Sequence, residues 1–443
     1  MSERAAPIAL SHLLHHTAEV VLAVQAGRSL TDVLASLPAQ ARPGVQALAF
    51  ESLRRLGGAR AVRAAMASRP PPREVDALLV TALALLWPPA PGQRAMYPEH
   101  TLVDQAVQAA HRRTPAAAGF VNALLRRFVR ERDALVAAAE RTPEGAFNHP
   151  LWWIERLKRE WPAQWQALLR QANERPPMTL RVNARRGTAQ TYVTRLAAKG
   201  MASRVLGSHA VLLEEPCPVA ELPGFAEGEV SVQDAAAQRA APLLIGDGLL
   251  PPRARVLDAC AAPGGKTAQL LELADLDLLA LDADALRLAR VQDTLIRLGL
   301  SASLRAADAR RPADWWDGRP FDAILLDAPC TASGIVRRHP DIRWLRRPAD
   351  IEALARTQAE LLDALWPLLV PGGRLLYATC SIFQAEGQRQ IDAFLQRMPP
   401  GSAALDPASP GHLLPLPDNG PAGALTPSAD GFFYALLHKN TPR

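Results

Sequence analysis

The stretch Phe321-Asp322-Ala323-Ile324-Leu325-Leu326-Asp327-Ala328-Pro329-Cys330 decides the fold that this sequence predicts. Its first six residues form an apolar run typical of a buried strand, and a carboxylate and a thiol follow directly after it. In open α/β sheets, ligands bind in the crevice beyond the strand ends. We therefore expect Asp327 and Cys330 to face a site, with Cys330 as a candidate nucleophile. A turn that holds an inert, buried cysteine is the alternative at this point.

Strands and helices alternate on both sides of this stretch. The apolar patterns predict strands at 255–258, 276–281, 302–305, 374–378 and 432–437, and helices at 267–273, 285–298 and 351–369. Such alternation is typical of a doubly wound, mainly parallel sheet. The sequence therefore predicts an α/β Rossmann-like domain over residues 229–440.

Two further regions precede this domain. Residues 5–140 carry apolar residues at helical spacing, separated by proline and glycine, and no strand pattern, which predicts an all-α helical bundle. Residues 150–228 mix helical and strand patterns, which predicts a small α+β module.

Positive charge is concentrated in the predicted bundle. Residues 1–140 contain 16 arginines, no lysine and 11 acidic residues, a net charge of +5 against +6 for the whole chain of 443 residues. Arg126 and Arg127 lie in one of its arginine clusters. A basic helical face can neutralise phosphates, and an ordinary solvated face is the alternative.

The cysteines and apolar runs bound the class of protein. The four cysteines are widely spaced without a C-x-x-C pair, which argues against a zinc site and a disulfide framework and fits a reducing cytoplasm. The longest apolar stretch, 77–87, is too short to cross a bilayer, and the N-terminus lacks a signal-type pattern. We expect a cytoplasmic protein without metal or membrane partner.

A glycine-rich turn lies between the first predicted strand and helix of the α/β domain. It comprises Cys260, Ala261, Ala262, Pro263, Gly264, Gly265 and Lys266. Such a turn lets backbone N–H groups approach a ligand at a helix N-terminus. Gly265-Lys266-Thr267 resembles a phosphate-binding loop, but Cys260 stands where that motif needs glycine, so a nucleoside triphosphate is not expected.

Carboxylates at the ends of the predicted strands point to an adenosyl ligand. Asp282 can accept hydrogen bonds from both ribose hydroxyls, and Asp308 can contact an adenine amino group. A lone aspartate at a strand end usually caps a helix or a turn. Three in register (Asp282, Asp308 and Asp327) favour the adenosyl ligand.

A second thiol, Cys380, follows the strand predicted at 374–378. If the two strands are neighbours, Cys330 and Cys380 face one crevice. Cytosine explains two thiols, because its carbon 5 is too weakly nucleophilic to take a methyl group unaided. A thiolate that adds to carbon 6 makes an enamine whose carbon 5 can attack, and a base must later remove the carbon 5 proton. The cytosine itself must also leave its stacked position in the RNA to enter such a pocket.

Two resemblances support this chemistry. Residues 97–128, above all Gly119-Phe120-Val121-Asn122-Ala123-Leu124-Leu125-Arg126, resemble the NusB-type helical RNA-binding domain. The motifs at 258–267, 327–330, 337–344 and 379–381 resemble the Sun-type RNA 5-methylcytosine methyltransferases, as do 231–234 and 430–434. The combination is similar to the bacterial branch of that family that methylates 16S ribosomal RNA.

The resemblance implies S-adenosyl-L-methionine as methyl donor, held by residues 260–266, Asp282, Asp308 and Asp327. It implies attack by Cys380 on carbon 6, release of product aided by Cys330, and contact of Asp327 with the cytosine edge beside Lys266. Arg126 and Arg127, together with the basic run Arg337, Arg338 and His339, are candidates for RNA contact, and we expect a monomer. Two alternatives remain open: another RNA such as tRNA as substrate, or a non-catalytic RNA-binding assembly factor.

Overall fold

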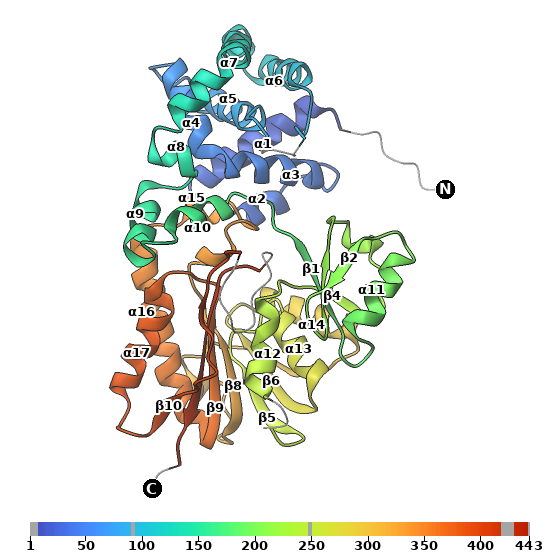
Figure 1. Ribbon diagram of the computed structural model, residues 1–443, viewed down its shortest axis with the longest axis vertical. Helices are drawn as coiled ribbons and strands as arrows, with labels where there is room; N and C mark the ends of the chain where they lie inside the picture. The colour runs from blue at the N-terminus through green and yellow to red at the C-terminus, as the bar shows by residue number, and fades with distance from the viewer. Residues whose placement is uncertain (1–7, 90–93, 247–249, 418–428, 442–443) are drawn as a thin grey trace. The chain divides into compact units, whose positions relative to one another are not determined.

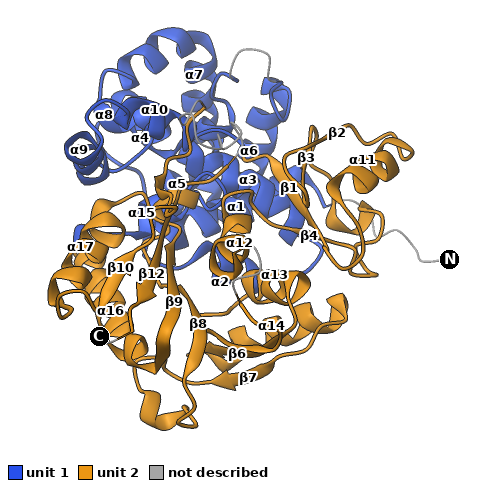
Figure 2. Cartoon of the chain, turned by 60° about the horizontal axis from the view of Figure 1, so that its bottom comes forward, with its two compact units in different colours: residues 1–175, 336–348 blue, residues 176–335, 349–443 orange. Residues whose placement is uncertain are grey.

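The computed structural model describes residues 8–89, 94–246, 250–417 and 429–441, which form two compact units. Figure 2 shows unit 1, residues 1–175 and 336–348, and unit 2, residues 176–335 and 349–443. The chain therefore leaves unit 2 after Ile335 and returns to it at Ala349. The three domains expected at 5–140, 150–228 and 229–440 remain a prediction, and residues 5–7 lie outside the described part.

Unit 1 is helical, as the periodicity predicts. Its α-helices are α1 (Leu10–Gln25), α2 (Leu30–Ala35), α3 (Arg42–Arg54), α4 (Leu56–Met66), α5 (Arg73–Leu85), α6 (Glu99–Arg113), α7 (Ala118–Ala139), α8 (Pro143–Phe147), α9 (Leu151–Glu160), α10 (Trp165–Gln171) and α15 (Ile342–Leu345).

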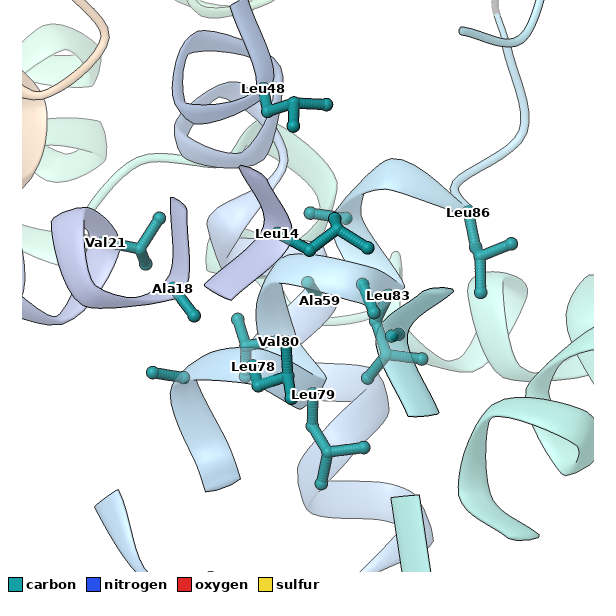
Figure 3. Close-up of a cluster of buried hydrophobic side chains, with 14 of the residues drawn as sticks. Leu14, Ala18, Val21, Leu48, Ala59, Leu78, Leu79, Val80, Leu83 and Leu86 are labelled. Atoms are coloured by element: carbon teal, nitrogen blue, oxygen red, sulfur yellow. The ribbon is translucent and has the colours of Figure 1, made fainter. Parts of the chain in front are cut away.

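The core of unit 1 forms where apolar faces of these helices meet. Leu14, Ala18 and Val21 on α1 repeat at spacings of four and three residues, so they share one helix face and are buried. They belong to the same buried cluster as Leu79 and Leu83 of α5, and Figure 3 shows these side chains together.

Helix α4 is not evident from the sequence, whose pattern predicts a single segment over 45–56. Two glycines lower helix propensity at its start, but tertiary packing requires them. A Cβ on Gly57 would lie 2.3 Å from the carbonyl oxygen of Glu144, and one on Gly58 would lie 2.5 Å from the Trp87 ring. Close approach of α4 to its neighbours thus overrides the local signal.

Residues 336–348 belong to unit 1 although their neighbours in sequence belong to unit 2. The fully buried Arg343 donates 2.6 and 3.3 Å hydrogen bonds to the carbonyl oxygens of Ala172 and Asn148. Trp344 Nε1 donates to the Leu53 carbonyl oxygen at 2.9 Å, and Asp341 Oδ2 accepts from the Leu30 backbone at 3.1 Å. This segment is thus anchored in the helical unit; we call it the tether.

The first part of unit 2 is a small antiparallel sheet of order β2-β3-β1-β4. Its elements are β1 (Met178–Val182), α11 (Ala189–Ala197), β2 (Ser203–Val205), β3 (Ala210–Leu213) and β4 (Val230–Val232). Strand β2 was not predicted from the sequence. The sequence pattern also places 230–232 with the last domain, but β4 pairs with β1.

The second part of unit 2 is an eight-stranded sheet of order β10-β12-β9-β8-β5-β6-β7, with β11 paired to β12. Its strands are β5 (Ala254–Asp258), β6 (Leu276–Asp282), β7 (Ser303–Ala306), β8 (Phe321–Asp327), β9 (Leu369–Thr379), β10 (Ala403–Leu405), β11 (Gly411–Leu413) and β12 (Phe432–Lys439). Strands β5 to β9 pair in parallel, and β10, β11 and β12 are antiparallel. The mainly parallel α/β prediction is confirmed.

Helices cover both faces of this sheet, as Figure 1 shows. They are α12 (Ala240–Ile245), α13 (Gly265–Leu273) and α14 (Ala285–Leu298) on one face, and α16 (Pro348–Leu365) and α17 (Gln388–Arg397) on the other. Side chains of a strand alternate between the faces: Leu325 packs with the first group, and Ile324 and Leu326 pack with the second. Two covered faces explain why β8 is continuously apolar from Ala323 to Leu326.

The helices of the described part of the chain do not include one that is both long and apolar enough to cross a membrane. The Pro- and Gly-rich segment 405–429, to which no role was assigned from the sequence, contains β11. Its residues 418–428 lie outside the described residues.

Candidate active site

The parallel strands of the large sheet deliver polar side chains to one edge. Asp258 ends β5, Asp282 ends β6, Asp327 ends β8 and Thr379 ends β9. Strand β5 lies between β6 and β8, so the chain order reverses at this point. Such a switch point opens a crevice at the carboxyl ends of the strands.

The glycine-rich loop lies at this switch point, between β5 and α13. Gly264, with φ of +100°, precedes the first residue of α13, and a Cβ there would lie 3.0 Å from the Cα of Val291 on α14. Both the backbone angle and the close approach therefore require glycine. The Ala262 N–H donates a 3.1 Å bond to Asp282 Oδ2, which holds the loop against the end of β6.

Asp282 and Asp308 differ in their present partners. Asp282 is 4% exposed and also accepts a 3.1 Å bond from the Asp284 backbone, which leaves acceptor capacity on its two oxygens. Asp308 is half-exposed, and its carboxylate is held by Arg310, which also donates to Glu360 at 2.8 Å. The hydrogen bonds from Arg310 lower the pKa of Asp308. Contact of Asp308 with adenine stays a prediction.

Asp258 lies beneath the loop and is fully buried. Its Oδ2 accepts a 2.6 Å bond from Thr267 Oγ1, and its Oδ1 has no hydrogen-bond partner among the described residues. Burial is the main cause that raises the pKa of this carboxyl to about 7, against the bond from Thr267. Asp258 therefore carries its proton far more readily than an ordinary aspartate.

Lys266 and Asp327 form an ion pair at the mouth of the crevice. Lys266 Nζ donates a 2.6 Å hydrogen bond to Asp327 Oδ2, and the ammonium lies 5.3 Å from the centre of the Phe432 ring. Burial lowers the pKa of Lys266, but the Asp327 carboxylate outweighs it, so that pKa ends above its ordinary value. Lys266 thus stays a cation.

The two cysteines meet beyond β8 and β9. Cys330 Sγ and Cys380 Sγ lie 3.4 Å apart, too far for a disulfide and close enough for a hydrogen bond between thiols. The bond with Cys380 and burial raise the pKa of Cys330 well above its ordinary range. Cys330 therefore keeps its proton, and either thiol can be the donor in the hydrogen bond between them.

The fully buried Glu386 lies behind the cysteine loops. Its carboxylate accepts bonds from the Thr331 backbone N–H at 2.8 Å and from Ser381 Oγ at 2.6 Å. Thr331 follows Cys330 directly, and Ser381 follows Cys380. One buried carboxylate therefore joins both loops.

The donor set around the crevice fits an S-adenosyl group. Asp282 offers acceptors for a ribose diol, and α13 directs its N-terminal N–H groups toward the loop. Arg287 donates a 3.2 Å bond to the Ala262 carbonyl oxygen and steadies the loop. The thiol of Cys260 has its pKa raised by burial, so it lines this region as an inert group.

The candidates for RNA contact lie in unit 1. Arg126 is exposed and lines a groove of about 710 Å³ between α6 and α7, together with Arg130 and three valines. Arg127 forms a 2.9 Å ion pair with Glu131. Arg337 is only 2% exposed in the tether, so its guanidinium does not offer the accessible cation that we expect for RNA contact. Arg338 is half-buried and His339 is exposed.

Two residues that organise the crevice were not predicted from the sequence. Arg181 on β1 donates 2.8 and 2.9 Å bonds to the Glu272 carboxylate on α13 and a 2.7 Å bond to the Gly265 carbonyl oxygen. An arginine inside the apolar run 178–182 was a usable signal. Glu386 was detectable as an acidic residue soon after Cys380 that precedes an amphipathic helix.

The sequence is similar to proteins of one family along most of its length. Residues 249–438 match the family model for 16S rRNA methyltransferase RsmB/F, and residues 149–220 match its ferredoxin-like domain. The chain is similar to the ribosomal RNA small subunit methyltransferase B of Vibrio cholerae serotype O1, 41% identical over 94% of both chains. The protein of the same name from Pseudomonas syringae pv. tomato is 44% identical over 93% of this chain and 89% of its own.

Solved structures show a related architecture. PH0851 superposes with a TM-score of 0.72 at 25% identity, covering 96% of this chain and 99% of its own. A methyltransferase homolog protein from Pyrococcus horikoshii has a TM-score of 0.55 at 27% identity, covering 67% of this chain and 97% of its own.

Proposed function

This chain belongs to the RsmB/F family of 16S rRNA methyltransferases, and on that premise we propose that it methylates carbon 5 of a cytosine in small-subunit ribosomal RNA through a covalent bond to Cys380. Membership of this family makes the chain an S-adenosyl-L-methionine-dependent RNA cytosine-5 methyltransferase. The observation that carries the covalent route is the 3.4 Å approach of the Cys330 and Cys380 sulfur atoms beyond two neighbouring parallel strands.

The methyl donor would be bound by the glycine-rich loop and the strand-end carboxylates. The loop residues Cys260 to Lys266 would hold its amino-acid part, Asp282 would accept hydrogen bonds from the ribose hydroxyls, and Asp308 would contact the adenine. Bound there, the donor supplies an electrophilic methyl group on a sulfonium. The attack on carbon 6, the orientation of the cytosine and the release of the product fall to side chains of this chain.

Cys380 is the attacking thiolate in this proposal. Its sulfur forms a bond to carbon 6 of the flipped-out cytosine, and the electrons of the carbon 5–carbon 6 double bond move so that carbon 5 becomes nucleophilic. Asp327 holds the cytosine edge and favours protonation of ring nitrogen 3, which stabilises the adduct. The Lys266 ammonium holds the Asp327 side chain in place through its hydrogen bond to Oδ2.

Carbon 5 then takes the methyl group, and the electron pair of the broken bond stays on the donor sulfur. A water molecule acting as base then takes the carbon 5 proton. The electron pair of that carbon–hydrogen bond restores the carbon 5–carbon 6 double bond, and the Cys380 sulfur leaves as a thiolate. Cys330 aids this release, because it keeps its proton and lies within hydrogen-bond distance of the leaving sulfur.

Methyl transfer to RNA tests the proposal. Protein, labelled donor and 16S ribosomal RNA should give 5-methylcytosine, and a chain that binds donor without transferring methyl would be an assembly factor instead. Cys380→Ser should abolish both transfer and covalent attachment with donor binding intact.

Cys330→Ser supplies the complementary test. This variant should attach to RNA and release it poorly, leaving a complex that survives denaturing gel electrophoresis. If Cys330→Ser failed to attach and Cys380→Ser did attach, the two roles would be reversed. Mapping 5-methylcytosine in ribosomal and transfer RNA of cells without the gene distinguishes the two substrates. We further propose that the protein acts as a monomer in the cytoplasm, where ribosomes are assembled.

A further inference from the structure

A buried hydrogen-bond network lies directly behind the two cysteines, in the described part of unit 2. Its centre is Glu386, which is 0% exposed and lies between the turn that carries Cys380 and helix α17. A buried carboxylate is costly unless donors surround it. The partners of Glu386 therefore indicate why it is there.

Four donors converge on this carboxylate, and they come from three elements. The Thr331 N–H and Gln358 Nε2 donate to Oε1 at 2.8 and 3.3 Å. The hydroxyls of Ser381 and Thr331 donate to Oε2 at 2.6 and 2.5 Å. An ionised carboxylate can accept all four of these hydrogen bonds. A protonated carboxyl group or an amide carries a hydrogen itself, and this hydrogen would point at one or more of the donors.

The geometry joins the residues that directly follow each cysteine. Thr331 belongs to the loop beyond β8, and Ser381 belongs to the turn beyond β9. Ser333 Oγ reinforces the link, because it lies 2.9 Å from Ser381 Oγ and accepts from the Ile382 N–H at 2.9 Å. The cysteine loops are thus held to each other through the residues that directly follow the cysteines.

We propose that Glu386 is the positioning residue that fixes the spacing of Cys330 and Cys380. It touches neither RNA nor donor, and it acts through Thr331 and Ser381. The inference rests on the proposed function, because the spacing matters when both sulfur atoms serve one cytosine. Its negative charge also helps to keep Cys330 protonated.

The spacing can be measured without RNA or methyl donor. Oxidised glutathione converts the two thiols to a Cys330–Cys380 disulfide. The two electrons and two protons that the thiols lose reduce one oxidised glutathione to two molecules of reduced glutathione. The equilibrium gives the effective concentration of one thiol toward the other. Peptide mass mapping separates this disulfide from any that involves Cys217 or Cys260.

Glu386→Gln in the full chain should lower this effective concentration about tenfold or more, the change expected when bonds to a charged acceptor are removed. Tyr377→Phe is the matched control. It removes bonds of Tyr377 Oη to the Gln358 side chain and to the Glu386 carbonyl oxygen, and it leaves the carboxylate bonds to both loops. Its effective concentration should stay within about twofold of the unsubstituted protein, since the carboxylate still holds both loops. Equal values for Glu386→Gln and the unsubstituted protein would overturn the proposal, as would an equal loss in Tyr377→Phe.

Milder variants keep the test decisive if Glu386→Gln does not fold. Thr331→Val and Ser381→Ala each remove one hydroxyl donor and should each lower the effective concentration about threefold; no change in both would overturn the proposal. In a Cys330→Ser background, Ser381→Ala should also slow covalent attachment to RNA. Absence of any attachment with the disulfide results as expected would count against the proposed function and leave the positioning role of Glu386 intact.

Discussion

Lys266 Nζ lies 2.6 Å from Asp327 Oδ2, and this ion pair joins the donor loop to the strand end that would hold the cytosine. We expect Lys266→Met to slow covalent attachment of Cys380 to RNA by about 10²-fold, because Asp327 loses the cation that orients it. Rapid-quench measurement of the adduct in a Cys330→Ser background checks this. Lys158→Met, which breaks the exposed 2.7 Å pair with Glu155, is the control and should leave the rate unchanged. Equal rates in both variants would remove Lys266 from the mechanism.

Arg181 and Glu272 form a buried pair that links the small sheet to α13. Arg181→Met should cost about 3–5 kcal/mol in the free energy of unfolding of unit 2, because Glu272 is left as an uncompensated buried charge. Arg181→Met/Glu272→Met should recover much of that loss. Affinity for the methyl donor should be lowered in both variants, since the Gly265 carbonyl oxygen loses its hydrogen bond from Arg181. Urea unfolding and calorimetric titration of donor measure the two effects, and full recovery of donor affinity in the double variant would contradict the link.

Asp258 predicts a pH dependence of stability. Its folded-state pKa of about 7 lies above the ordinary value, so the folded chain binds a proton that the unfolded chain releases. Stability therefore falls as the pH rises from about 4 to about 7 and is level above that. Between pH 5 and pH 8 this group should cost about 3 kcal/mol. The Asp258→Asn side chain stays neutral. Between pH 5 and pH 8 the free energy of unfolding of this variant, measured with urea, should therefore fall by about 3 kcal/mol less than that of the unsubstituted protein. Parallel curves for the two proteins would show that Asp258 is ionised throughout.

The tether, which contains the motif at 337–344, is expected to stabilise the helical unit. Burial lowers the pKa of Arg343 to about 9, yet its bonds to Ala172, Asn148 and Asn173 hold it inside unit 1. Arg343→Met should destabilise unit 1 by about 2–4 kcal/mol, because buried acceptors lose their donor. Hydrogen exchange of unit 1 amides measures this. The exposed Arg28→Met, also in unit 1, should change stability by less than about 0.5 kcal/mol.

RNA binding should depend on charges of α7 more than on the tether. Arg126→Gln/Arg127→Gln should weaken RNA binding and lower the salt dependence by roughly 0.7 for each phosphate that is no longer neutralised, with donor affinity unchanged. Binding titrations at several salt concentrations measure the slope. Arg337→Gln, which changes a buried cation, should leave that slope unaltered once the folded fraction is matched. A larger effect from Arg337 than from Arg126 and Arg127 would assign RNA contact to the tether instead.

Much of the chemistry of this protein could be predicted from its sequence. Local patterns determined the strands and helices of the α/β domain, because buried strands are short apolar runs and covering helices are amphipathic. They also determined that Asp282, Asp327 and Cys380 follow strands, which in a parallel sheet places them at one edge. The motifs around Lys266 and Cys380 then specified the reaction.

Only the tertiary structure decided which side chains meet. The pairing of β8 with β9 brings the Cys330 and Cys380 sulfur atoms to 3.4 Å, and their separation of 50 positions in the sequence gave no measure of that distance. Glu386, Arg181 and Arg343 are charged residues that local patterns assign to the surface. They are buried because each finds donors or acceptors from segments remote in sequence, and a buried charge is stable only with such partners.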